Sequence, residues 1–246
     1  MSRTMRDKLK SFHILAEKDQ LQETPIIDLL HEETCLAFLQ KQKIELKAPS
    51  VSVAASMISK RYAYLVVAST LYSMIEFNSA LRLPLHACAL SKERNLCIKE
   101  DMCYWHGADV ERAQWREAVL CELFSEHITP VLSILGKTSR IPESILWENV
   151  AVRINSIYRK TLSNEVDLMK IERLKSDFYF LKHATGELFN LNKNPIGHYL
   201  KIGEELTLNP YRKTCCMYYK LKEHSEESAY CGNCPIIKNR KKNITR

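Results

Sequence analysis

Four cysteines lie close together near the C-terminus and could ligate a metal. Cys215 and Cys216 are adjacent, and fourteen residues separate them from the C-x-x-C pair of Cys231 and Cys234, in the stretch RKTCCMYYKLKEHSEESAYCGNCPI. Four thiolates that meet at one point suit either a tetrahedral zinc ion or an iron–sulfur cluster. Because the surrounding segment is charged and has few apolar residues, we predict that it needs such a bound group to fold.

The adjacent pair bears on the choice between zinc and an iron–sulfur cluster. Zinc sites usually take ligands from C-x₂₋₄-C turns, whose intervening residues let both sulfurs face one ion. Neighbouring side chains point to opposite faces of a strand, or differ by about 100° on a helix, so Cys215 and Cys216 can share a target only across a sharp bend. A two-iron cluster is a larger target with two metal atoms. The spacing therefore favours iron–sulfur and leaves zinc as the alternative.

Positive charge is concentrated in the same segment. The formal net charge of the chain is +7, and residues 211–246 carry nine Lys and Arg against three Glu. A [2Fe–2S] core held by four thiolates is negatively charged and becomes more so on reduction, so nearby cations ease that reduction. A zinc site with four cysteine ligands is also negative, and a solvated basic tail or a nucleic-acid patch is the alternative. The cations expected to act in this way are Arg212, Lys213, Lys220, Lys222, Lys238 and Arg240.

The remaining cysteines are scattered singly among apolar neighbours, and we interpret them as small buried side chains. No secretory segment is visible, and the most apolar stretch, residues 62–75, is too short to span a bilayer. We therefore expect a cytoplasmic protein with no membrane span, in a reducing compartment where cysteines do not serve as disulfides. The five scattered cysteines are Cys35, Cys88, Cys97, Cys103 and Cys121.

Periodicity and turn residues predict a mostly α fold with a small antiparallel β-sheet or hairpin, an α+β class. Residues 1–208 are expected to form this body, with the β region near 80–106, and residues 209–246 the metal-binding segment, with a boundary at Asn209–Pro210. A surface helix is expected over 1–20 and a second helix over 24–42. The second is capped by Thr24, has Pro25 in its first turn, and has Ile26, Leu29, Leu30, Leu36 and Leu39 on one face. A buried helix over 50–77 and a hairpin over 85–100 follow, then a helix over 109–137 capped by Asp109 and kinked or split at Pro130, and two helices that begin at Pro142 and end near Gly186.

The cysteine segment resembles the C-terminal iron–sulfur segment of the FhuF-type ferric siderophore reductases. That family has an Arg-x-x-Cys-Cys-x-x-Tyr opening and a Cys-x-x-Cys close. A Leu-Trp-x-Asn helix upstream is also similar. The gap between the two cysteine pairs is longer here than is usual in the family, and the loop 222–228 would absorb the difference. The matching residues are Leu146, Trp147, Asn149, Arg212, Cys215, Cys216, Tyr219, Cys231 and Cys234.

The resemblance implies an enzyme, an iron–sulfur oxidoreductase acting on ferric siderophore chelates. Cys215, Cys216, Cys231 and Cys234 would bind a [2Fe–2S] cluster and form the redox site, which passes one electron to Fe(III) and releases Fe(II) in the cytoplasm. Hard oxygen donors hold Fe(III) far better than Fe(II), so reduction loosens the chelate. Because the chain lacks nucleotide-binding motifs, the electron is expected from a ferredoxin- or flavodoxin-like donor protein or a small reductant, and a typically acidic donor suits the basic C-terminus.

Two other interpretations stay open. One is a binding module for nucleic acid or protein, stapled by a zinc ion on the four cysteines and without redox activity, although the body offers no basic recognition helix and nucleic-acid binding is not expected. The other is a relative of the aerobactin-type siderophore synthetases, whose C-terminal domain the body also resembles. The chain is short for that enzyme and lacks a nucleotide-binding signal.

Overall fold

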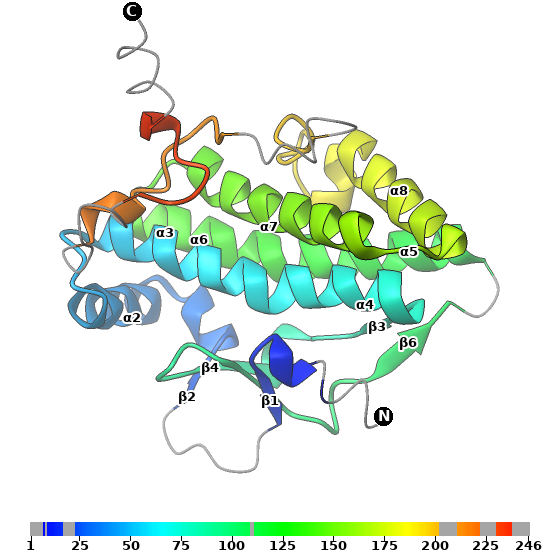
Figure 1. Ribbon diagram of the computed structural model, residues 1–246. Coiled ribbons are helices and arrows are strands. Elements are labelled where there is room, and N and C mark those ends of the chain that lie inside the picture. Colours follow the sequence, from blue (N-terminus) through cyan, green and yellow to red (C-terminus); the bar gives the residue numbers. More distant parts are fainter. Residues whose placement is uncertain are drawn as a thin grey trace, which may run out of the picture.

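The computed structural model describes residues 7, 9–16, 23–108, 111–201, 211–221 and 230–237. Long helices fill most of the molecule, and the short strands gather along one side of them (Figure 1). The cysteine segment lies on another side, beside the first turns of the helix Glu143–Asn164, α7. The predicted mostly α fold with small sheets is confirmed.

Two long helices form the centre of the fold, and each contains a π-helical segment in its middle. The first runs through α3 (Val51–Tyr62), the π-helix η2 (Ala63–Ala68) and α4 (Ser69–Phe77), as predicted for a buried helix over 50–77. Its first turn is capped by Ser50, whose hydroxyl accepts a hydrogen bond from the amide of Val53. The second runs through α5 (Arg112–Cys121), the π-helix η4 (Glu122–Ile128) and α6 (Thr129–Ser139).

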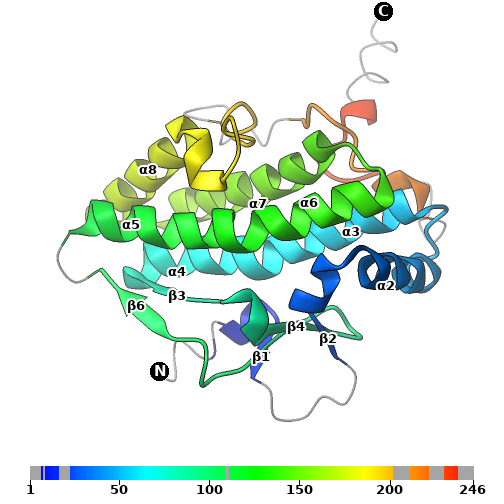
Figure 2. The same cartoon turned by 180° about the vertical axis from the view of Figure 1, so that it is seen from behind.

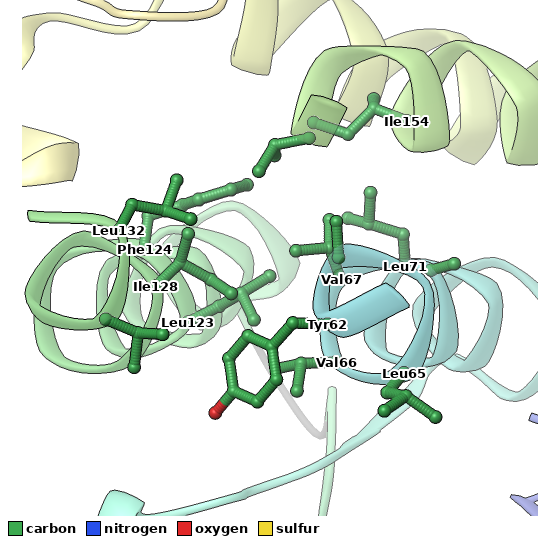
Figure 3. Close-up of a cluster of buried hydrophobic side chains, with 14 of the residues drawn as sticks. Tyr62, Leu65, Val66, Val67, Leu71, Leu123, Phe124, Ile128, Leu132 and Ile154 are labelled. Atoms are coloured by element: carbon green, nitrogen blue, oxygen red, sulfur yellow. The ribbon is translucent and has the colours of Figure 1, made fainter. Parts of the chain in front are cut away.

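The π-helical segments lie side by side, and their apolar side chains interdigitate (Figure 3). Tyr62, Val66 and Leu71 face Leu123 and Phe124 across this interface, all nearly or fully buried. Pro130 was expected to kink or split the second helix, but the helix is continuous from Arg112 to Ser139. Pro130 falls in the first turn after the π-helical segment, where the hydrogen-bonding pattern has already shifted.

Two further helices cover this pair and confirm the predictions for residues 142–186. α7 (Glu143–Asn164) packs on α3, η2 and α6, and α8 (Leu168–His183) packs on α4 and α7 (Figure 2). A 3₁₀ turn, η5 (Gly186–Phe189), follows α8 and brings Phe189 edge-on against Trp147 of α7.

The β region is larger than the predicted hairpin. The hairpin itself is confirmed, because β4 (Cys88–Ser91) pairs antiparallel with β5 (Leu96–Ile98). The 3₁₀ turn η3 (Leu85–Ala87) replaces the first half of the expected strand. β1 (Ile14–Ala16) adds in parallel to β5 and β2 (Glu23–Pro25) adds antiparallel to β4, while β3 (Ser79–Leu81) and β6 (Trp105–Gly107) form a separate two-stranded sheet.

Of two helix predictions near the N-terminus, one holds only in part and the other is wrong. Residues 7 and 9–11 are helical, but residues 14–16 are in β1, so the helix does not extend over all of 1–20. Thr24 and Pro25 belong to β2, an edge strand in which the missing N–H of proline is tolerated, so they do not begin a helix. The 3₁₀ turn η1 (Ile27–Leu30) follows, and α2 (Glu32–Glu45) begins only at Glu32, which leaves Leu36 exposed.

Some predictions fall on residues outside the described part of the chain. These are the Asp109 cap, the Asn209–Pro210 boundary, the loop 222–228, and the cations Lys222, Lys238 and Arg240. Within the described part, one helix, Arg112–Ser139, is long and apolar enough to cross a membrane by length and composition alone. Half of its most apolar window is buried against other elements, and the core helix of a soluble protein passes the same test.

Candidate functional site

The two cysteine-bearing stretches, residues 211–221 and 230–237, lie beside α3 and α7 (Figure 1, orange and red). The amide of Arg212 donates a hydrogen bond to the carbonyl of Asn233 at 2.9 Å and joins the two stretches. Met217 and Leu221 pack on an apolar patch formed by Ala48, Val53 and Ala54. The segment is therefore anchored to the body by backbone pairing and by apolar contact.

The structure brings Cys216 and Cys231 together. Their sulfurs are 3.4 Å apart and share a hydrogen bond, a separation far too long for a disulfide. Two thiolates on one metal with tetrahedral geometry would be about 3.8 Å apart, because each metal–sulfur bond is about 2.3 Å. The spacing of Cys216 and Cys231 is therefore close to that of two ligands on one metal atom.

The four cysteines do not all meet at one point. Among the described residues, no group of three or more His, Cys, Asp or Glu side chains could by itself hold a metal ion. Burial raises the pKa of Cys215, and the charges of Cys216 and Cys234 act in the same direction. Cys216 and Cys234 are buried, while Cys215 and Cys231 are partly exposed.

The backbone bends sharply directly after the adjacent cysteines. Met217, which follows them, has a left-handed backbone with φ of 61°, a conformation uncommon for a residue other than glycine. The bend turns the amide of Met217 back onto the sulfur of Cys215, at 3.3 Å. Backbone N–H groups that point at cysteine sulfur are one of the means by which proteins set cluster potentials.

The ionisation of the close pair is asymmetric. The hydrogen bond with Cys231 lowers the pKa of Cys216 to about 5, and the positive charges of Lys60 and Arg212 act in the same direction. The same hydrogen bond, together with burial, raises the pKa of Cys231. Burial also raises the pKa of Cys215. Since a ligand must be a thiolate, Cys216 is the cysteine best prepared to bind a metal first.

Lys60 of α3 supplies a cation that contacts one of the sulfurs. Its Nζ lies 3.6 Å from the Sγ of Cys216 and 4.8 Å from the centre of the Tyr218 ring. Of the cations predicted for this role, Arg212 is paired with a carboxylate and Lys213 bonds to the carbonyl of His198. Lys60 was missed because it lies well inside a helix distant in sequence, which no local pattern links to the cysteines.

A buried carboxylate on α7 holds the backbone ahead of the cysteines. Glu148 accepts hydrogen bonds from the amides of Lys213 at 2.6 Å and Thr214 at 2.7 Å, and from the hydroxyl of Thr214. The guanidinium of Arg212 lies 3.6 Å from the same carboxylate. Glu148 is only 3% exposed, so this carboxylate is satisfied by the cysteine segment and not by water.

The next residue on α7 connects the segment to α3. Asn149 accepts a hydrogen bond from Arg212 Nη1 at 2.6 Å and donates to the hydroxyl of Ser59 at 2.7 Å. The hydroxyl of Ser56 in turn donates to the carbonyl of Cys216 at 2.8 Å. The Leu-Trp-x-Asn motif therefore has a structural role, because Leu146 and Trp147 are core residues and Asn149 links three parts of the site.

Two tyrosines that lie between the cysteine pairs in sequence contact each other. Tyr219 and Tyr230 stack with ring centres 5.7 Å apart and an angle of 18° between their planes. These residues flank the stretch 222–229 in sequence. Their contact fixes the two ends of that stretch next to each other, so the fourteen-residue gap does not prevent the cysteine pairs from approaching.

Comparison with known proteins supports the resemblance of the body. A family model described as "Ferric iron reductase FhuF-like transporter" matches residues 105–195, which is less than half of the chain. The matched part runs from β6 past η5 and includes Leu146, Trp147 and Asn149, while the four cysteines lie outside it. No curated protein matches the chain. The similarity to the FhuF-like ferric iron reductases is thus confirmed over residues 105–195.

The chemistry of the four cysteines suits an iron–sulfur cluster or a zinc ion, and the structure brings the sulfurs of Cys216 and Cys231 into contact. Cys215, Cys216, Cys231 and Cys234 are free thiols, a donor set that suits iron–sulfur or zinc. The sulfur of Cys215 accepts a hydrogen bond from a backbone amide, and that of Cys216 one from the ammonium of Lys60. A positive charge beside the sulfurs matches the negative charge that a four-thiolate cluster carries.

Proposed function

We propose that this protein is a ferric siderophore reductase of the cytoplasm that uses a [2Fe–2S] cluster held by Cys215, Cys216, Cys231 and Cys234. When bound, the cluster supplies one-electron storage. The substrate is Fe(III) in a siderophore chelate, and the product is Fe(II), which hard oxygen donors hold weakly. Residues 209–246 form the redox segment in this proposal and residues 1–208 its scaffold.

The close pair of Cys216 and Cys231 is the observation that carries the proposal. Their sulfurs are spaced like two ligands of one metal atom and lie beside Lys60 in a segment clamped to α7. The body that carries this clamp is similar to the FhuF-like ferric iron reductases over residues 105–195. Sulfur chemistry and family resemblance thus point to the same activity from separate parts of the chain.

The residues around the sulfurs have distinct tasks in this proposal. Glu148 and Asn149 fix the backbone of residues 212–214, which orients the adjacent cysteines. Lys60 and the amide of Met217 donate hydrogen bonds to sulfur and stabilise its negative charge. The electron would come from an acidic ferredoxin- or flavodoxin-like protein or a small reductant, since a basic surface next to the site favours an acidic partner.

Anaerobic purification followed by metal analysis tests the proposal. We expect a red-brown protein with two iron and two sulfide per chain, by the composition of such a cluster. Its chemically reduced form should give an electron paramagnetic resonance signal and reduce ferric chelates in single turnover. Cys231→Ser and Cys234→Ser should remove colour and reduction together, whereas Cys121→Ser, outside the segment, should keep both.

The zinc alternative gives a different result in the same experiment. A colourless protein with one zinc per chain and no ferric reduction would contradict the proposal and favour a zinc-stapled binding module. Reduction that persists in Cys231→Ser would also contradict it, because the redox centre would then lie elsewhere.

A further inference from the structure

A groove lined by aromatic and charged side chains lies next to the cysteine site. It has a volume of about 580 Å³ and runs between residues 11–12, the α3–η2–α4 helix and α7. Phe12, Tyr64 and Tyr72 supply aromatic lining, and Arg153 and Lys160 supply positive charge. The volume falls within the range of small-molecule sites.

Arg153 connects this groove to the sulfurs. It lines the groove and also a second cavity of about 200 Å³, which is bounded by Lys60, Arg212 and Cys231. The Nε of Arg153 donates a hydrogen bond to the carbonyl of Lys60, whose ammonium contacts the sulfur of Cys216. One side chain therefore separates the groove from the cysteine pair.

Among the described residues, the positive charges in and beside the groove have no carboxylate partner. Within the described part of the chain, none of Arg61, Arg153 and Lys160 forms an ion pair with an acidic side chain. The two acidic residues at the far end of the groove, Glu76 and Glu165, are both bonded to Lys170.

The guanidinium groups of Arg61 and Arg153 both lie near the ring of Tyr64, which lines the groove. Arg153 and Arg61 lie 5.5 and 5.8 Å from the centre of the Tyr64 ring. Burial lowers the pKa of Arg153, and the positive charges of Arg61 and Arg212 lower it further, while Tyr64 and Cys216 act in the opposite direction. Among the described residues, Arg153 donates one side-chain hydrogen bond, from Nε to the carbonyl of Lys60, so its other guanidinium donors are available to an anion.

We propose that this groove binds the ferric chelate, and that it selects chelates of net negative charge. This inference rests on the proposed function, because it places the substrate of that reaction next to its redox centre. Guanidinium donors and aromatic faces recognise an anionic, oxygen-rich complex by charge-assisted hydrogen bonds and stacking. Arg153 contacts the chelate from the side that faces Cys231.

Gallium(III) complexes test binding without electron transfer, because gallium(III) has the charge and a similar size to iron(III) and is not reduced. Calorimetric titration of the anaerobically purified protein should show binding of a trianionic gallium(III) tris-catecholate. A monocationic gallium(III) complex of an amine-bearing linear tris-hydroxamate should bind at least about tenfold more weakly. Equal affinity for the two complexes would overturn the proposal.

Substitutions locate the site. Arg153→Gln should weaken binding of the tris-catecholate complex by about tenfold or more, and Lys160→Gln, at an exposed position, by a few fold. Lys175→Gln removes the same charge from an exposed position on α8, in a different groove, and should leave the affinity unchanged. Arg153→Lys is the second variant should Arg153→Gln unfold, and it should retain part of the affinity.

The outcomes separate this inference from the proposed function. Binding by a wild-type protein that reduces no ferric chelate would uphold the groove and contradict only the redox proposal. Binding should also survive in Cys231→Ser, because Cys231 does not line the groove. Active ferric reduction with unchanged affinity in Arg153→Gln and Lys160→Gln would overturn the groove and leave the reductase standing. Equal weakening by Lys175→Gln would show a general charge effect and would also overturn the groove.

Discussion

Glu148 of α7 and Thr214 of the cysteine segment are joined by two hydrogen bonds, one from the amide at 2.7 Å and one from the hydroxyl. Sixty-six residues separate them in sequence. The carboxylate that makes both bonds is buried and also faces the guanidinium of Arg212. The position of the adjacent cysteines thus depends on a side chain from the middle of the protein.

Removing this carboxylate should loosen the cysteine segment. Glu148→Ala leaves the buried Arg212 without its carboxylate partner, so we expect a loss of about 3–5 kcal/mol in unfolding free energy and a lower iron content. Glu148→Gln keeps one acceptor and should cost about 1–2 kcal/mol. Urea denaturation and iron analysis measure both effects. Glu143→Gln, exposed on the same helix, is the control, and an equal loss there would contradict a specific clamp.

Lys60 should tune the reduction potential of the site. Its ammonium contacts the sulfur of Cys216, and a positive charge there favours the more negative, reduced state. Lys60→Gln is expected to lower the potential by several tens of millivolts. Redox titration followed by absorbance measures the shift, with Lys41→Gln on the exposed face of α2 as control. Identical potentials in both variants would mean that Lys60 has no electrostatic role.

In protein stripped of metal, Cys216 should be unusually reactive. Its pKa is lowered to about 5, chiefly by the hydrogen bond with Cys231, and an ordinary thiol ionises near pH 8.5. Because the thiolate is the nucleophile, alkylation by iodoacetamide should rise with a midpoint near pH 5 at Cys216. Peptide mass spectrometry after brief labelling resolves each cysteine. A midpoint above pH 8 at Cys216 would show that the close pair does not persist without metal.

His127 should make the fold less stable at acidic pH. It is buried, accepts a hydrogen bond from the hydroxyl of Tyr62 at 2.5 Å and donates one to the carbonyl of Leu83 at 2.6 Å. Burial lowers the pKa of His127 to about 4, below its ordinary value of 6.5. The unfolded chain therefore takes up a proton more readily than the folded protein between these values. Stability is fully present above pH 6.5 and is lost as the pH falls towards 4.

The loss expected from His127 is about 3 kcal/mol between pH 7.5 and pH 4, from the difference of the two pKa values. Urea denaturation across this range measures it, after subtraction of the same curve for His127→Gln. His86→Gln, exposed in η3, should leave the curve unchanged. A wild-type curve parallel to that of His127→Gln would show that His127 does not carry the effect.

The ion pair that ties α5 to α8 should be more important than a surface pair. Asp177 is fully buried and accepts hydrogen bonds from both Nη atoms of Arg112, at 2.7 and 2.8 Å. Asp177→Ala should cost about 3–5 kcal/mol, because it leaves Arg112 unpaired. Glu32→Ala removes the exposed partner of Lys137 and should cost less than about 1 kcal/mol. Thermal denaturation measures the loss of stability in each variant. An equal loss in Asp177→Ala and Glu32→Ala would contradict this ranking.

The long helices could be predicted because their apolar periodicity is a local property. Residues 50–77 and 142–164 have that periodicity, and Ser50 and Pro142 mark their starts. β1 and β2 could not be predicted, because each is three residues long and exists only through pairing with β5 and β4. Thr24-Pro25 is a good helix start by local rules, and long-range pairing overrides that preference.

For the candidate site, the sequence indicated the four candidate cysteines but not the residues that support them. Of these cysteines, the structure brings Cys216 and Cys231 into contact. Glu148, Lys60 and Ser56 were missed because each acts on the segment from more than sixty residues away. A weak signal existed on α3, where the polar side chains Ser56 and Ser59 lie three residues apart among apolar neighbours. Buried polar positions of this kind indicate a partner elsewhere in the fold.

The stacked rings of Tyr219 and Tyr230 have a consequence for how such sites are searched for in sequences. Because this contact holds Tyr219 and Tyr230 together, the number of residues between them has little effect on how the two cysteine pairs are placed. A search pattern that fixes the number of residues between the two cysteine pairs would then miss proteins that place their cysteines in the same way. Anchoring the pattern on the flanking tyrosines, and leaving the interval free, would recover them.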